Sequence, residues 1–128
     1  MGKALKFCLP IIGALVAAPA ALAQQKPDMV QTMELFLQAN HAATKCAKPD
    51  QATLSRFLAN FKEVTLRAAE EMKKRNPGMS EQQVYEGFRT SNNTVARQVD
   101  GMIQAGGCGD PRIQDLLKRF ETQANLKL

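Results

Sequence analysis

Few residues of this chain could do chemistry, and the cysteines are the most informative of them. Cys46 and Cys108 lie 62 positions apart and belong to no CxxC or CxxCH motif. Without such a motif, a structural disulfide is favoured over a redox, metal or haem-attachment role for the pair. Disulfides persist in oxidising compartments. We therefore expect a Cys46–Cys108 bridge if the chain is exported.

A second group of candidate residues is a stripe of thioethers that ends in the single histidine. Met29, Met33, Leu37 and His41 follow one another at four-residue steps, so a helix would place them on one face. Thioether and imidazole ligands suit Cu(I). The competing interpretation is core packing, since Met fills gaps in cores and a half-buried His finds a hydrogen-bond partner. We favour packing and expect no cofactor. A carrier of Cu(I) or of a small ligand is the alternative.

The third group is a polar run over residues 89–94, which reads Arg-Thr-Ser-Asn-Asn-Thr inside an otherwise amphipathic segment. The apolar stripe of that segment requires an apolar side chain near Ser91 or Asn92, and none is present. One interpretation is a bent or water-bridged helix. The other is a polar-lined groove where a partner docks. On the second interpretation we predict that Arg89, Asn92 and Asn93 contribute to binding.

No recognisable catalytic motif accompanies these groups. The sequence contains one His and lacks a GxSxG turn, an HExxH motif and a Gly-rich phosphate loop. Its carboxylates are scattered along helical segments, where they are usually solvated. We therefore predict that the protein is not an enzyme.

The first 23 residues have the features of a secretory signal peptide. Lys3 and Lys6 precede an apolar stretch over residues 7–18, and Ala21-Leu22-Ala23 forms a small-x-small cleavage site. The apolar stretch is too short to cross a bilayer comfortably. The sequence thus predicts a signal peptide over 1–23 and a destination in the periplasm or outside the cell. No transmembrane segment is expected after cleavage.

Cleavage also changes what composition implies. With Lys3 and Lys6 removed, the formal net charge falls from +5 to +3, which concerns solubility and gives no indication of nucleic-acid binding. Aromatic residues make up only 5% of the chain and Trp is absent, so a base-stacking surface is not expected either. Cys8 leaves with the signal, and Cys46 and Cys108 remain as an even pair.

Residues 24–128 then read as a single domain of four helices that position these groups. Capping residues and breaks mark the boundaries: Asp28, Lys48-Pro49-Asp50, Asn76-Pro77-Gly78, the Ser80/Gln83 capping box, Gly106-Gly107 and Asp110-Pro111. The second helix has the clearest core stripe, which comprises Leu54, Phe57, Leu58, Phe61, Val64, Ala68 and Met72. No stretch alternates with period two for long enough to form a strand.

Short connections favour antiparallel neighbours. We predict an all-α fold, a small disulfide-stapled four-helix bundle with up-down-up-down topology. The order helix, Cys, helix, helix, Cys over about residues 30–110 resembles the layout of small periplasmic immunity proteins that neutralise type VI secreted amidases. The Gly-rich first-helix pattern of that family is absent, and the layout carries over no residue roles.

Together these features favour a small periplasmic protein that binds another exported protein, for example as an inhibitor, immunity protein or assembly accessory. The alternative function is a periplasmic carrier of a small ligand or of Cu(I) through Met29, Met33 and His41.

Overall fold

The computed structural model describes residues 26–128, which form four α-helices. The helices are α1 (Met29–Cys46), α2 (Gln51–Arg75), α3 (Glu81–Gly106) and α4 (Pro111–Ala124). No strand occurs within residues 26–128, so the predicted all-α class is confirmed. The predicted signal peptide, residues 1–23, lies outside the described residues.

Each helix begins at a side chain that accepts hydrogen bonds from the otherwise free N–H groups of the first turn. Asp28 accepts from Val30 and Gln31, and Asp50, Ser80 and Asp110 cap α2, α3 and α4 in the same way. At α3 the side chain of Gln83 also accepts from the Ser80 N–H, which completes the capping box. The starts predicted from the sequence are therefore confirmed.

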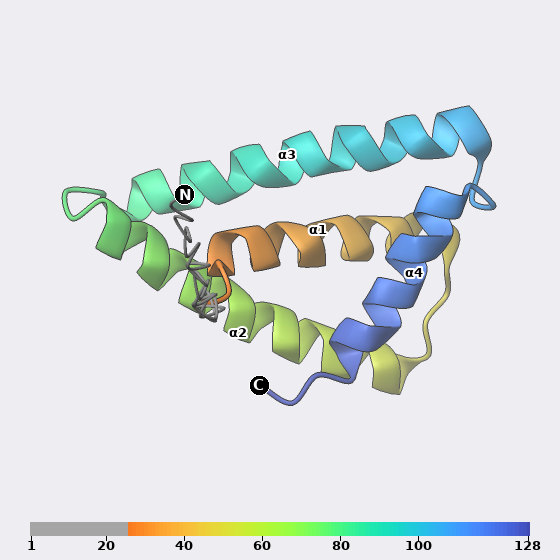
Figure 1. The fold of residues 1–128 in the computed structure, drawn as a ribbon, viewed down its shortest axis with the longest axis horizontal. Helices are drawn as coiled ribbons and strands as arrows, with labels where there is room; N and C mark the ends of the chain where they lie inside the picture. Colours follow the sequence, from red (N-terminus) through yellow and green to blue (C-terminus); the bar gives the residue numbers. More distant parts are fainter. Residues whose placement is uncertain (1–25) are drawn as a thin grey trace, which may run out of the picture.

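The helices alternate in direction, as expected for up-down-up-down topology, and α1 lies at the centre (Figure 1). α2 and α3 meet at the short turn over residues 76–80 and diverge from it, with α1 in the wedge between them. α4 runs obliquely across the wide end of the wedge, against α1 and α2. As a result, α1 packs extensively against all three other helices, whereas α3 contacts α2 and α4 only sparsely.

At the narrow end of the wedge, the side chain of Met72 lies against the backbone of α3 at Gly87. A Cβ atom at Gly87 would lie 3.1 Å from the Cε atom of Met72, so the tip of the Met72 side chain would have to shift slightly to accept one. Glycine at this position accommodates the Met72 side chain between the two helices. Farther from the turn the two helices separate, and each of them packs against α1 rather than against the other.

The core is centred on aromatic side chains from three helices. The ring of Phe57 lies 5.4 Å from that of Phe36 and 4.2 Å from that of Phe120, centroid to centroid, and joins α2 to α1 and α4. Phe61 stacks on Phe36 at 5.9 Å. Leu58 does not join this core: its side chain is 48% exposed, so its predicted core position is wrong. The buried residues of α2 include Phe57, Val64 and Ala68, and Leu58 lies about 100° round the helix from Phe57, at the edge of that face.

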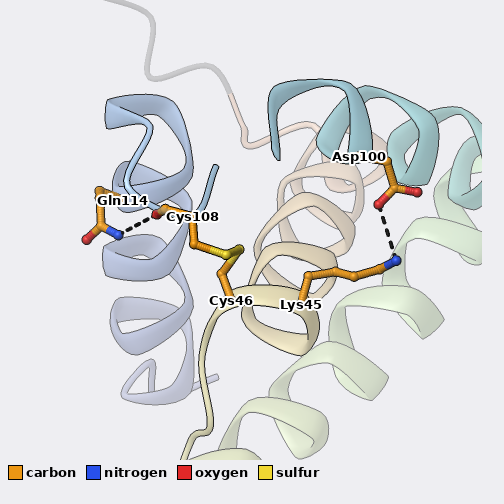
Figure 2. Close-up of a disulfide and its surroundings, with 5 residues drawn as sticks. All are labelled: Lys45, Cys46, Asp100, Cys108 and Gln114. Atoms are coloured by element: carbon orange, nitrogen blue, oxygen red, sulfur yellow. Dashed lines mark hydrogen bonds and ion pairs between the residues drawn. A yellow bond between two sulfur atoms is a disulfide. The ribbon is translucent and has the colours of Figure 1, made fainter. Parts of the chain in front are cut away.

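The predicted disulfide is present, with the two Sγ atoms 2.05 Å apart and the Cα atoms 5.4 Å apart. Cys46 is the last residue of α1, and Cys108 lies in the loop between α3 and α4 (Figure 2). Gly107 leads into this loop with φ +70°, a conformation that glycine adopts without strain. Gln114 donates a hydrogen bond from Nε2 to the Cys108 carbonyl at 2.8 Å. The bridge thus joins the end of α1 to the start of α4.

Candidate functional site

An open groove lies between α2 and α3, with α1 beneath it. It encloses about 270 Å³ and is lined by Met33 and Leu37 from α1, Phe61 and Thr65 from α2, and Tyr85, Phe88, Arg89 and Asn92 from α3. We call this site the α2–α3 groove. It exists because α2 and α3 diverge from their turn and because α4 packs against α1 and α2 elsewhere.

The floor of the groove is apolar and its rim is polar. Met33 and Leu37 are buried, and Phe61 and Phe88 are half-buried. On the α3 side Tyr85 is 60% exposed although it is a large aromatic residue. Within residues 26–128, the Tyr85 hydroxyl makes no hydrogen bond, so this ring is not held by a polar contact of the described fold. A buried apolar floor beneath exposed aromatic and polar side chains is typical of a recognition surface.

Arg89 supplies the charge of the groove. Its Nη1 atom lies 3.8 Å from the Glu86 carboxylate, too far for a hydrogen bond, and the side chain is 64% exposed. No other charged residue of the described chain, residues 26–128, lines the groove. The guanidinium therefore has donors available for a guest.

The structure brings together two of the three residues predicted from the polar run. Arg89 and Asn92 line the groove, whereas Asn93 is exposed and does not line it. The run does not interrupt α3, which is continuous from Glu81 to Gly106. Buried Val84 and Val95 on either side of the run anchor the helix, so residues 89–94 can be polar without breaking it.

The thioether and histidine stripe divides into separate environments. Met33 is 2% exposed and belongs both to the core and to the groove floor, which agrees with the packing interpretation. His41 lies near the other end of α1, where its Nε2 atom is 3.3 Å from Oδ1 of Asp100. The Nζ atom of Lys45 lies 3.5 Å from the same oxygen. These polar contacts connect the end of α1 to α3.

Helix geometry separates the members of the stripe. Met33 and His41 are eight residues apart, about 12 Å along the helix axis. The two residues lie in separate environments, Met33 on the groove floor and His41 beside Asp100. Across residues 26–128, no three His, Cys, Asp or Glu residues come close enough to hold a metal ion together.

A second polar network fixes the start of α1 to the end of α2. The Met29 N–H donates to Oε2 of Glu71 at 2.8 Å, and the Arg75 guanidinium contacts both Asp28, at 3.1 Å, and Glu71. The pKa of Asp28 is lowered, first by the hydrogen bond from the Gln31 N–H and then by Arg75. Arg75 also borders a wide hollow at the 76–80 turn, of about 420 Å³. Since its charge is engaged in this network, we assign it a structural role.

Sequence reasoning missed most of the groove lining. The sequence predicts Phe61 only as a core residue, and its patterns do not single out Tyr85. The available signal was Tyr85 itself, which lies next to the core stripe of α3 and close in sequence to Arg89. The convergence of three helices on one groove has no counterpart in local sequence patterns.

None of the helices within residues 26–128 is both long enough and apolar enough to span a membrane. Comparison with known proteins finds no family model that matches the chain, no curated protein similar to it and no solved structure that matches its fold.

Proposed function

We propose that this chain is a small exported, non-enzymatic protein that binds another exported protein in the periplasm through the α2–α3 groove. The observation that carries the proposal is the groove itself, with a buried apolar floor and a rim that contains Tyr85, Arg89 and Asn92. Tyr and Arg are the residue types that, with Trp, dominate the binding energy of protein interfaces. An inhibitor, an immunity protein or an assembly accessory would each use such a surface.

The disulfide supports the proposed location. Such bridges are stable in oxidising compartments and are common in small exported domains. The Cys46–Cys108 bridge joins the end of α1 to the loop before α4, so it would stabilise the scaffold on which the groove is built. Fractionation of cells that express the full chain tests the location: we expect the protein in the periplasmic fraction, with Gln24 as its first residue by mass spectrometry. Unprocessed protein in the cytoplasm would contradict it.

Affinity purification from periplasmic extract tests the binding function. The mature chain, tagged at its C-terminus, serves as bait beside an Arg89→Ala/Asn92→Ala variant. A matched control is Arg97→Ala/Gln98→Ala, which changes two exposed residues of the same helix outside the groove. We expect wild type and control to retain the same partner and the groove variant to lose it, while all three give the same circular dichroism spectrum.

Two results would contradict the proposal. If the wild type retains nothing beyond the tag alone, the binding function is wrong. If the groove variant and the control retain the partner equally, the function stands but the contact surface lies elsewhere.

A further inference from the structure

The charge of the α2–α3 groove restricts what can occupy it. Among residues 26–128, Arg89 is the only charged residue that lines it, and no carboxylate of this part of the chain does. The nearest acid to the guanidinium, Glu86, is 3.8 Å away and half-exposed, so it competes weakly with a guest. The groove is therefore complementary to an anionic group next to an apolar one.

The open shape of the groove suits the side chains of a protein partner. Its volume of about 270 Å³ is near the lower end of the ~300–1,000 Å³ typical of small-molecule sites, but such sites enclose most of their ligand, whereas this groove is open. Along α3 the lining runs from Tyr85 to Asn92, about 10 Å or two helical turns. Two apolar side chains one turn apart on a partner helix would lie about 5–6 Å apart and fit within that length.

Building on the binding function proposed above, we propose that the groove binds a segment of a partner protein that presents one or two large apolar side chains beside an aspartate or glutamate. The apolar side chains insert between Phe61 and Phe88, above Met33 and Leu37. The carboxylate pairs with Arg89 at the rim. Exposed Tyr85 covers the apolar contact from the α3 side.

A phage-displayed random peptide library, selected on the purified mature protein, tests this inference without knowledge of the natural partner. We expect enriched peptides to share one or two large apolar residues, with Asp or Glu within one helical turn of them. A parallel selection on Arg89→Glu should instead enrich Lys or Arg at that position. Selection on Arg97→Glu, the same charge change on the same helix outside the groove, should give the acidic motif again.

Affinities of the selected acidic peptide provide the quantitative comparison. We expect Arg89→Glu to weaken binding by about fivefold or more, because an attractive contact worth up to about 1 kcal/mol becomes repulsive. Tyr85→Ala should also weaken binding, whereas Leu66→Ala, at a residue that is 54% exposed and outside the groove, should not. Thermal melting of each variant shows whether it is folded.

Several outcomes would overturn the inference. These are no enrichment, the same motif from wild type and Arg89→Glu, or a sequence without acidic residues. Dimerisation that Arg89→Glu abolishes in sedimentation would assign the groove to a second copy of this chain. Tight binding of decanoate in the groove, without peptide enrichment, would assign it to a small amphiphile. If a natural partner is captured but binds Arg89→Glu equally well, only this inference fails and the binding function stands.

Discussion

Removal of the Cys46–Cys108 bridge should cost this domain a large part of its stability. The bridge closes a loop of 62 residues, for which the chain-entropy relation gives about 4 kcal/mol at 25 °C. Domains of this size have total stabilities of about 5–15 kcal/mol. Cys108 is exposed and Cys46 half-buried, so replacement by Ser buries little additional polar surface. We therefore expect Cys46→Ser/Cys108→Ser to remain helical in the cold but to unfold far more easily.

Urea unfolding monitored by circular dichroism measures the effect. With a slope of about 1–3 kcal/mol/M, a loss of 4 kcal/mol lowers the midpoint by about 1–4 M. Wild-type protein unfolded in the presence of a reductant is the matched control, because it breaks the bridge and keeps both sulfur atoms. Agreement between reduced wild type and the double Ser variant supports the loop-entropy argument. A loss under 1 kcal/mol in reduced wild type would refute it, and a loss in the Ser variant alone would assign the effect to local packing.

Three further predictions concern the core, acid stability and the polar run. Phe57→Ala removes a fully buried ring that contacts Phe36 and Phe120. We expect urea titration to show a loss of about 3–5 kcal/mol in the free energy of unfolding. A loss of about 1 kcal/mol would contradict the central role of this ring. Hydrogen bonds in the folded protein lower the pKa values of four carboxyl groups, those of Asp28, Asp50, Glu81 and Asp110. The stability that these groups contribute is therefore complete above their ordinary pKa values of 3.8–4.5 and is lost as the pH falls through the lower folded values. Urea midpoints that do not fall between pH 5 and pH 2 would contradict this prediction. Asn92→Ala/Asn93→Ala replaces two exposed residues that are poor helix formers. The melting temperature should therefore hold or rise, while partner binding falls. A destabilised variant that keeps its partner would show that the polar run over residues 89–94 is structural.

Local signals in the sequence were sufficient to predict the helices and the bridge. Asp28, Asp50, Ser80 and Asp110 mark helix starts through hydrogen bonds to residues two or three positions ahead, an interaction that depends only on nearby chain. The pairing of Cys46 with Cys108 followed from counting the cysteines left after cleavage. Neither inference required knowledge of how the helices pack.

The groove could be predicted only in part, because it depends on packing. Hydrophobic periodicity shows which face of α2 is apolar, but it does not show how much of that face its neighbours cover, and Leu58 was misplaced for this reason. Arg89 and Asn92 were identified because polar residues interrupt an apolar pattern. Tyr85 and Phe61 come to the same groove from helices whose angle is set by interhelical packing, including the close approach at Gly87.

The central position of α1 has a consequence for the order in which the chain can fold. α1 is the first helix of the described chain to be synthesised, yet its partners include α4, as in the 3.4 Å contact from Arg119 to Gln38 across 81 residues. A chain that emerges N-terminus first can cover α1 with α2 and α3, but the side of α1 that packs against α4 stays uncovered until nearly all of the chain is available. Contacts over such long separations slow folding relative to bundles held together by near neighbours. Fragments that end before residue 111 would leave the apolar faces of α1 and α2 open, and we expect them to aggregate rather than to fold as smaller bundles.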